Sequence, residues 1–245
     1  VRGEGESYPA DAVILATGGV SYPATGSTGD GHRLAAALGH TVTELDGSLV
    51  PLEGVIAPGV PCARLQGLSL RNVGLTVYEG KKKIYQDFGE LLFTHFGVSG
   101  PLVLSASAHM RHFGKKDYRF EIDLKPALDH NQLDKRLLAD FQKYLNHDFR
   151  NALDDLLPQK LIPVVIELSG IPPQEKVHDI TREQRLALLA VLKAFPVAIT
   201  KKRPVTDAIV TTGGVKVGEV DTKTMESKIF HGLYLAGELL DADAY

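Results

Sequence analysis

Two apolar segments near opposite ends of the chain have the pattern of buried strands that run into glycine turns. Residues 13–19 read VILATGG, and residues 232–238 read GLYLAGE. A short apolar run is typical of a strand covered on both faces, and the small residues after it let the backbone approach a ligand. We therefore expect the two segments to border one cofactor site, although most of the chain separates them.

The residues next to these segments continue an α/β pattern. A helix is predicted at 30–38, where Gly39 ends it, and a short strand is predicted at 41–45. Near the C-terminus the same pattern returns, with apolar residues at 208–210 and the sequence TTGG at 211–214.

The middle of the chain has a different pattern. Alternating runs such as 73–77 and 118–124, with a hairpin turn at 79–81, predict an antiparallel sheet or small barrel. Apolar residues at helical spacing then predict helices, two of which begin with capping boxes. The predicted helices cover 101–112, 129–145, 158–168 and 181–194, and the capping boxes pair Asp129 with Gln132 and Thr181 with Gln184.

This change of pattern predicts an α/β domain in two pieces, interrupted by an α+β insert. The two pieces are residues 1–47 and 206–245. The insert, 48–205, divides into a β-rich, barrel-like part at 48–125 and a helical part at 126–195. With 245 residues, 44% of them hydrophobic, the chain is long enough to bury the core of one or two domains.

Composition narrows the class of protein. The net charge of −3 predicts that nucleic acid is not a partner, because domains that bind it carry a basic excess. We expect no membrane span, since no apolar run reaches the length that one needs. The single cysteine, Cys62, is typical of a reducing compartment, so we expect a cytoplasmic protein. The chain begins without methionine and stops just after a strand and turn, so we expect both ends to be cuts through a longer protein.

Glu238 is the most specific candidate in the two glycine segments. A carboxylate at the end of a strand accepts hydrogen bonds from a ribose or ribityl hydroxyl. The alternative is an acidic residue that stabilises the N-terminus of a helix. The loop GSTGDG at 26–31 is either an anion-binding turn or a structural loop. The dinucleotide fingerprint G-x-G-x-x-G is absent from the sequence.

Few side chains suggest catalysis on their own. His95 is a candidate proton donor or substrate-orienting group, and the alternative is a half-buried structural residue. His109 and His112 have the spacing of a metal pair, but no cysteine or acidic cluster completes a ligand set, so no metal is expected. The sequence has no G-x-S-x-G motif, and Cys62 has no reactive signature. A redox cofactor that carries the chemistry itself is therefore the natural agent.

Six blocks of sequence occur in a fixed order along the chain. They are ADAVILATGGVSYP at 10–23, GSTGDGH at 26–32, GELLFTHFGVSGP at 89–101, VTTGGV at 210–215, TMESK at 224–228 and GLYLAGELLDAD at 232–243. Together they resemble the BaiN/YhiN-type, aminoacetone oxidase-like FAD-dependent oxidoreductases of bacteria and archaea, over essentially the whole chain. The resemblance implies a two-dinucleotide-binding, Rossmann-like FAD domain, interrupted by an insert with a β-barrel-like part and a helical part.

The resemblance also implies which residues bind the cofactor. Thr17, Gly18 and Gly19 match the turn beside the nucleotide and pyrophosphate of FAD. Gly237 and Glu238 match the turn near the ribityl chain and pyrophosphate, and Asp243 matches a segment close to the flavin. Thr94, His95, Thr212, Gly213 and Gly214 match segments that face the isoalloxazine ring or the substrate. The N-terminal G-x-G-x-x-G unit of the family and its last glycine-rich segment have no counterpart here, so we expect the isolated chain to bind FAD weakly or not at all and to be inactive alone.

The expected function is therefore that of an FAD-dependent oxidoreductase. Hydride transfer through flavin N5 would act on a small molecule, either an amine or an unsaturated carbonyl compound, with NAD(P)H as a candidate electron donor. One alternative is a non-catalytic flavin sensor or an RNA-associated flavoprotein, although the net charge disfavours RNA. Another is a fragment that binds no FAD.

Overall fold

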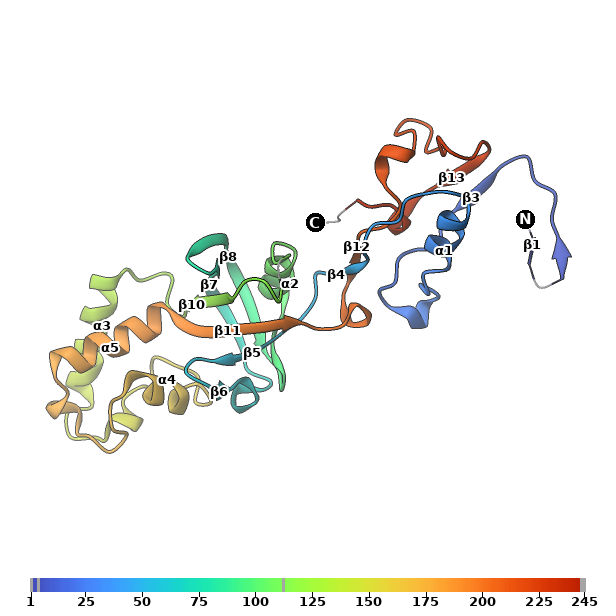
Figure 1. Ribbon diagram of the computed structural model, residues 1–245. Helices are drawn as coiled ribbons and strands as arrows, with labels where there is room; N and C mark the ends of the chain where they lie inside the picture. The colour runs from blue at the N-terminus through green and yellow to red at the C-terminus, as the bar shows by residue number, and fades with distance from the viewer. Residues whose placement is uncertain (1, 4, 112, 243–245) are drawn as a thin grey trace. The chain divides into compact units, whose positions relative to one another are not determined.

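The computed structural model describes residues 2–3, 5–111 and 113–242 (Figure 1). The chain divides into two compact units. We call the first the terminal unit, which consists of the chain up to Val50 and from Lys202 onward, and the second the central unit, Pro51–Lys201. The predicted insert, 48–205, extends a few residues further at each end than the central unit does.

A closed β-barrel forms the core of the central unit. Six strands are hydrogen-bonded in the ring β11-β10-β7-β8-β9-β5, with β5 pairing back to β11, and β6 pairs with β5 outside the ring. Closure leaves no free edge on the ring strands. The bounds are β5 (Leu52–Ile56), β6 (Val60–Pro61), β7 (Ser69–Glu79), β8 (Lys82–Phe93), β9 (Gly97–Ser99), β10 (Tyr118–Asp123) and β11 (Phe195–Lys202).

Side chains from neighbouring strands fill the barrel in layers. Leu75 of β7 lies opposite Ile122 of β10, which lies opposite Phe195 of β11. All three are fully buried. Because side chains alternate along a strand, the next layer follows two residues along, and the predicted alternation in 73–77 and 118–124 is confirmed.

Four helices complete the described part of the central unit. Helix α5 contacts both α3 and α4. Both predicted capping boxes are confirmed: the Asp129 carboxylate accepts the Gln132 N–H at 2.8 Å, and the Thr181 hydroxyl accepts the Gln184 N–H at 3.2 Å. The helices are α2 (Pro101–Ser107), α3 (His130–Lys143), α4 (Ile162–Ser169) and α5 (Arg182–Lys193).

The terminal unit is built on a pair of parallel strands. β3 (Val13–Leu15) pairs with β13 (Leu233–Leu235), with Leu15 opposite Leu235. Helix α1 (Asp30–Ala37) packs on this pair through a small core that includes Leu15, Ala35 and Leu235. Two antiparallel pairs accompany it: β12 (Val210–Thr212) with β4 (Asp46–Ser48), and β1 (Arg2–Gly3) with β2 (Glu6–Ser7).

Three local predictions need correction. The strand predicted at 41–45 is wrong: Val42 makes a single bridge to Val215, and the strand begins at Asp46. The helix predicted at 101–112 ends at Ser107, and His112 lies outside the described residues. β11 was not predicted, although its buried residues Phe195, Val197 and Ile199 alternate as a strand requires.

The barrel accommodates Pro196 because its carbonyl still accepts the Ala57 N–H at 3.2 Å, so the residue keeps its role as an acceptor. In the described ranges, no helix combines the length and apolar character that crossing a membrane requires.

Candidate functional site

The two glycine turns leave the same edge of the terminal unit's sheet. Because β3 and β13 run parallel and in register, residues 16–19 and 236–238 follow neighbouring strand ends. Gly18 and Gly237 each have φ of 75°, the left-handed conformation that favours glycine. The structure thus brings together five of the predicted cofactor residues, namely Thr17, Gly18, Gly19, Gly237 and Glu238.

Thr211 links the two turns. Its hydroxyl oxygen accepts the Val20 N–H at 2.8 Å and the Ser21 N–H at 3.1 Å, while its own N–H donates to the Glu238 carboxylate. The Ser21 hydroxyl also donates to Glu238, at 3.3 Å. Sequence reasoning selected the neighbouring Thr212 and missed Thr211, because nothing in the letters TTGG separates the two threonines.

Two glycines let these elements pack closely. A Cβ at Gly19 would collide with the Thr211 hydroxyl and would lie 3.1 Å from Cδ of Glu238. A Cβ at Gly31, in the first turn of α1, would collide with the Thr17 hydroxyl. Thr211 is buried and has no free space into which it can move, whereas Thr17 is exposed.

Gly213 and Gly214 are close to the protein's own backbone. Gly213 has φ of 83°, and a Cβ there would collide with the carbonyl oxygen of Glu44. Gly214 has φ of 144°, and a Cβ there would lie 2.5 Å from the carbonyl oxygen of Leu239. Both are buried. Their lack of a side chain is therefore explained by packing within the terminal unit. Asp243, the remaining predicted cofactor residue, lies outside the described residues.

The edge formed by the two turns has unused donors. Among the described residues, no acceptor is bonded to the backbone N–H groups of Gly18, Gly19, Gly237 or Glu238. Clustered backbone donors of this kind suit an anion such as a pyrophosphate. Glu238 uses Oε1 for its internal bonds, and Oε2 has no protein donor among the described residues, so it is available to a hydroxyl.

His32 adds a buried polar group next to this edge. It lies in α1, is only 4% exposed, and neither ring nitrogen has a partner within the described part of the chain. Burial lowers the pKa of His32, while the Leu239 backbone and the charge of Glu238 act in the opposite direction. The Leu239 backbone lies close enough to act on the pKa but makes no hydrogen bond of normal geometry with the ring. A buried nitrogen without such a bond is costly, which indicates a partner that the protein itself does not supply. Together with the free amides, His32 makes these residues suitable for a large polar cofactor.

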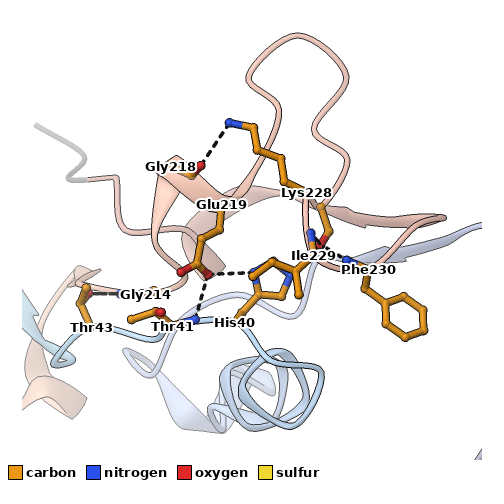
Figure 2. Close-up of polar contacts among 10 residues, drawn as sticks. His40, Thr41, Thr43, Gly214, Gly218, Glu219, Lys228, Ile229 and Phe230 are labelled. Atoms are coloured by element: carbon orange, nitrogen blue, oxygen red, sulfur yellow. Dashed lines mark hydrogen bonds and ion pairs between the residues drawn. The ribbon is translucent and has the colours of Figure 1, made fainter.

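A second polar network lies at the end of α1 (Figure 2). His40 Nδ1 lies 3.2 Å from Glu219 Oε2, and its Nε2 lies 2.9 Å from the Ser227 hydroxyl. The order Ser–His–Glu is that of a hydrolytic triad. However, Ser227 is buried, and its oxygen accepts the Ile229 N–H at 3.0 Å and the Phe230 N–H at 2.8 Å. Both lone pairs are occupied, so the hydroxyl cannot act as a nucleophile and the network is structural.

Glu219 anchors the other end of this network. It accepts the Thr41 N–H at 2.8 Å. Figure 2 draws this bond as a dashed line. Hydrogen bonds from Thr41 and then from His40 hold the pKa of Glu219 below its usual range. The acid is therefore ionised at neutral pH and fixes the histidine ring.

Replacing His40 by alanine is expected to lower the free energy of unfolding of the terminal unit by about 1–3 kcal/mol. The change removes the partner of Glu219 and leaves the buried Ser227 hydroxyl without an acceptor. Urea unfolding followed by circular dichroism measures the loss. His231→Ala is the matched control, since that side chain is 99% exposed. Equal effects of the two substitutions would contradict a structural role for His40.

His95 lies in the central unit, in the turn between β8 and β9. The turn is closed by the Thr94 N–H, which donates to the Gly97 carbonyl at 2.9 Å, and by the Thr94 hydroxyl, which accepts the Gly97 N–H at 3.1 Å. The ring of His95 is exposed and contacts Phe96 edge-on. The histidine is therefore not the half-buried residue that the structural alternative expected.

Comparison with known proteins identifies the central unit. Residues 46–210 match the family model described as HI0933-like protein barrel and H2TH domain. The chain is 31% identical to a protein of Clostridium scindens named 3-dehydro-bile acid delta(4,6)-reductase, over 99% of this chain and 59% of that protein. Two further relatives are both named ribosomal RNA dihydrouridine synthase. The one from Haemophilus influenzae is 33% identical over 95% of this chain and 55% of that protein. The one from Escherichia coli is 29% identical over 98% of this chain and 57% of that protein.

These relatives correct one prediction. The exclusion of nucleic acid as a partner was wrong, since two relatives are named for a reaction on ribosomal RNA. The net charge of −3 is a sum over the chain and does not report cations that gather in one place.

The chain spans between 55 and 59% of the length of these relatives. The family model covers the whole barrel and the helices beside it, and the similarity to the reductase continues through both glycine turns. The barrel and helical insert that the sequence predicted are those of the matched model. The chain therefore belongs to the HI0933-like family, the BaiN/YhiN-type flavoproteins.

Proposed function

We propose that the protein containing this chain is an FAD-dependent reductase of carbon–carbon double bonds conjugated to a carbonyl group. The names of the relatives support this reaction class. One describes a reductase of unsaturated 3-oxo bile acids, and the other describes the conversion of uridine, whose ring double bond is conjugated to a carbonyl, to dihydrouridine. The two substrates differ in size and charge but share the reacting group.

The observation that carries the proposal is the parallel pairing of β3 and β13, which sets the two glycine turns at one sheet edge. The free amides of Gly18, Gly19 and Gly237 would bind the pyrophosphate, and Oε2 of Glu238 would accept from a ribityl hydroxyl. Thr17 and His32 would supply further polar contacts. When bound, FAD supplies hydride transfer at N5, with NAD(P)H as the proposed electron donor.

The residues of the chain have separate tasks in this reaction. The terminal unit binds and orients the cofactor. In reducing a conjugated double bond, hydride adds to one alkene carbon and a proton to the other, and we assign the proton donor to the exposed His95. Thiol chemistry has no part in it, because burial raises the pKa of the Cys62 thiol to about 11. A single buried cysteine also suits a reducing compartment, so we propose a cytoplasmic enzyme.

The test uses protein expressed from the complete gene and reduced anaerobically with NADPH. We expect a 3-oxo-4-ene steroid acid or uridine-containing ribosomal RNA to reoxidise the flavin, with a product heavier by two hydrogens in mass spectrometry. His95→Gln should slow this reoxidation and leave reduction by NADPH unchanged. Turnover of an amine with oxygen, and of neither unsaturated compound, would contradict the proposed reaction.

A further inference from the structure

A cavity of about 600 Å³ lies in the central unit, beside the start of β7. It is lined by Arg71 and Asn72 of β7, by Phe88 of β8, and by residues 124–128, which follow β10 and precede α3. None of these residues belongs to the cofactor site described above.

A β-bulge in β7 places two of the lining residues at the cavity. The pairing of β7 with β8 shifts register between Leu70 and Val73, so Arg71 and Asn72 have no ladder partners. Asn72 has φ of 57°, which non-glycine residues adopt rarely. Bulges of this kind are frequent next to functional sites, where they redirect side chains. Asparagine adopts this conformation more readily than most non-glycine residues, so it suits the bulge at the wall of the cavity.

Phe88 is an apolar residue on a polar surface. It is 58% exposed, and its cross-strand partner is Gly74, which has no side chain to cover the ring. The ring borders a second cavity as well, of about 790 Å³. The two cavities differ in charge. The second is lined by the acidic residues Asp87, Glu121 and Asp123 together with Lys193. The first is lined by Arg71 and Lys125 and by no acid, although the Asp123 carboxylate accepts the Lys125 backbone N–H at 2.9 Å.

The cations of the first cavity are weakly neutralised. Arg71 has a 78% exposed side chain and lies 4.0 Å from Glu90. Burial lowers the pKa of Lys125, and the nearby positive charge of Arg136 lowers it further. The backbone at Lys125 is held in place, because the Lys193 ammonium donates to the carbonyls of Lys125 and Leu128 at 3.3 and 2.8 Å. A bound anion would offset the repulsion between the Lys125 ammonium and Arg136.

We propose that this cavity binds one nucleotide of a single-stranded RNA, with the base stacked on Phe88 and the phosphate between Arg71 and Lys125. The Asn72 amide offers both a donor and an acceptor to the edge of the base. An exposed aromatic ring beside cations is the usual composition of a single-strand binding site. The inference rests on the proposed function, since it takes the RNA-directed relatives as the guide to substrate class.

The experiment measures fluorescence anisotropy of a labelled uridine-rich RNA oligonucleotide with protein from the complete gene. Phe88→Ala should weaken binding roughly ten-fold, and Phe88→Tyr should retain it, because stacking on an aromatic ring is lost only in the first. Lys125→Ala should reduce the slope of log affinity against log salt by about 0.7, as expected for one lost phosphate contact to a single strand. Phe230→Ala and Lys81→Ala are controls at other exposed sites.

The outcomes separate this inference from the proposed function. Unchanged RNA affinity in Phe88→Ala, an equal loss in Phe230→Ala, or no RNA binding by the wild-type protein would each overturn the nucleotide site. Flavin content and bleaching by NADPH, measured on the same wild-type preparation, report on the proposed function without RNA. Binding of a protein in place of RNA at this cavity would also overturn the inference.

Discussion

Replacing Gly19 by alanine is expected to abolish retention of FAD by the full-length protein and to lower the free energy of unfolding by about 1–3 kcal/mol. The added methyl group would collide with the Thr211 hydroxyl and press on Glu238. Thr211 is the residue that bonds to both glycine turns, so moving it separates the two strand ends that form the proposed pyrophosphate and ribityl contacts. Two effects, on folding and on binding, therefore follow from one methyl group.

The measurement is the ratio of flavin to protein after purification, together with urea unfolding of the same samples. Gly218→Ala is the matched control, because a Cβ there meets no atom within 4 Å and the residue has no positive φ. The control should retain FAD and stability. If Gly19→Ala bound FAD as the wild-type protein does, the proposed role of the two turns would be wrong.

Replacing His32 by phenylalanine is expected to have opposite effects on stability and on binding. The change removes two buried nitrogens without normal hydrogen bonds, and this gain offsets the added volume of the larger ring, so the free energy of unfolding without cofactor should stay equal or increase. Binding of FAD should weaken by roughly ten-fold, the equivalent of one lost hydrogen bond of about 1.4 kcal/mol. Calorimetric titration of FAD and urea unfolding of the cofactor-free protein measure the two effects separately.

The pH dependence of stability gives a second test of His32. Burial holds its pKa in the folded state below the ordinary value of about 6.5, so the unfolded chain binds the proton more readily. The contribution is therefore complete above about pH 6.5 and is lost as the pH falls through the lower folded pKa. His32→Phe should lose less stability than the wild type over this acidic range. His231→Phe should behave nearly as the wild type does, because that side chain is 99% exposed and its pair with Glu226 is screened by solvent. Identical pH profiles for all three proteins would show that His32 is not buried in its neutral form.

The sequence predicted those elements whose formation depends on a few neighbouring residues. The capping boxes at Asp129 and Thr181 each depend on a few neighbouring residues, and each forms as expected. The apolar run before Gly18 forms the expected strand, but the expectation that it is covered on both faces is wrong, because Ile14 is 70% exposed. β11 was missed although Phe195, Val197 and Ile199 alternate as a strand requires, because Pro196 interrupts the pattern near its start and the long-range pairing that closes the barrel has no local signal.

The candidate site was predictable only in part for a similar reason. The glycine turns are recognisable because the positive φ angles that they need are typical of glycine. Thr211 and His32 have roles that depend on which segments pack together, and a threonine beside a second threonine or a histidine within a helix has no distinguishing pattern. The charges beside Phe88 come from segments that the fold assembles, so the net charge of the chain concealed them.

The most direct test of the central claim is the flavin content of the protein expressed from its complete gene. After denaturation and chromatography, we expect stoichiometric FAD in the wild-type protein, and we expect its visible absorbance to be bleached by NADPH before denaturation. A colourless protein that contains no FAD after purification and takes up none on addition would contradict the account.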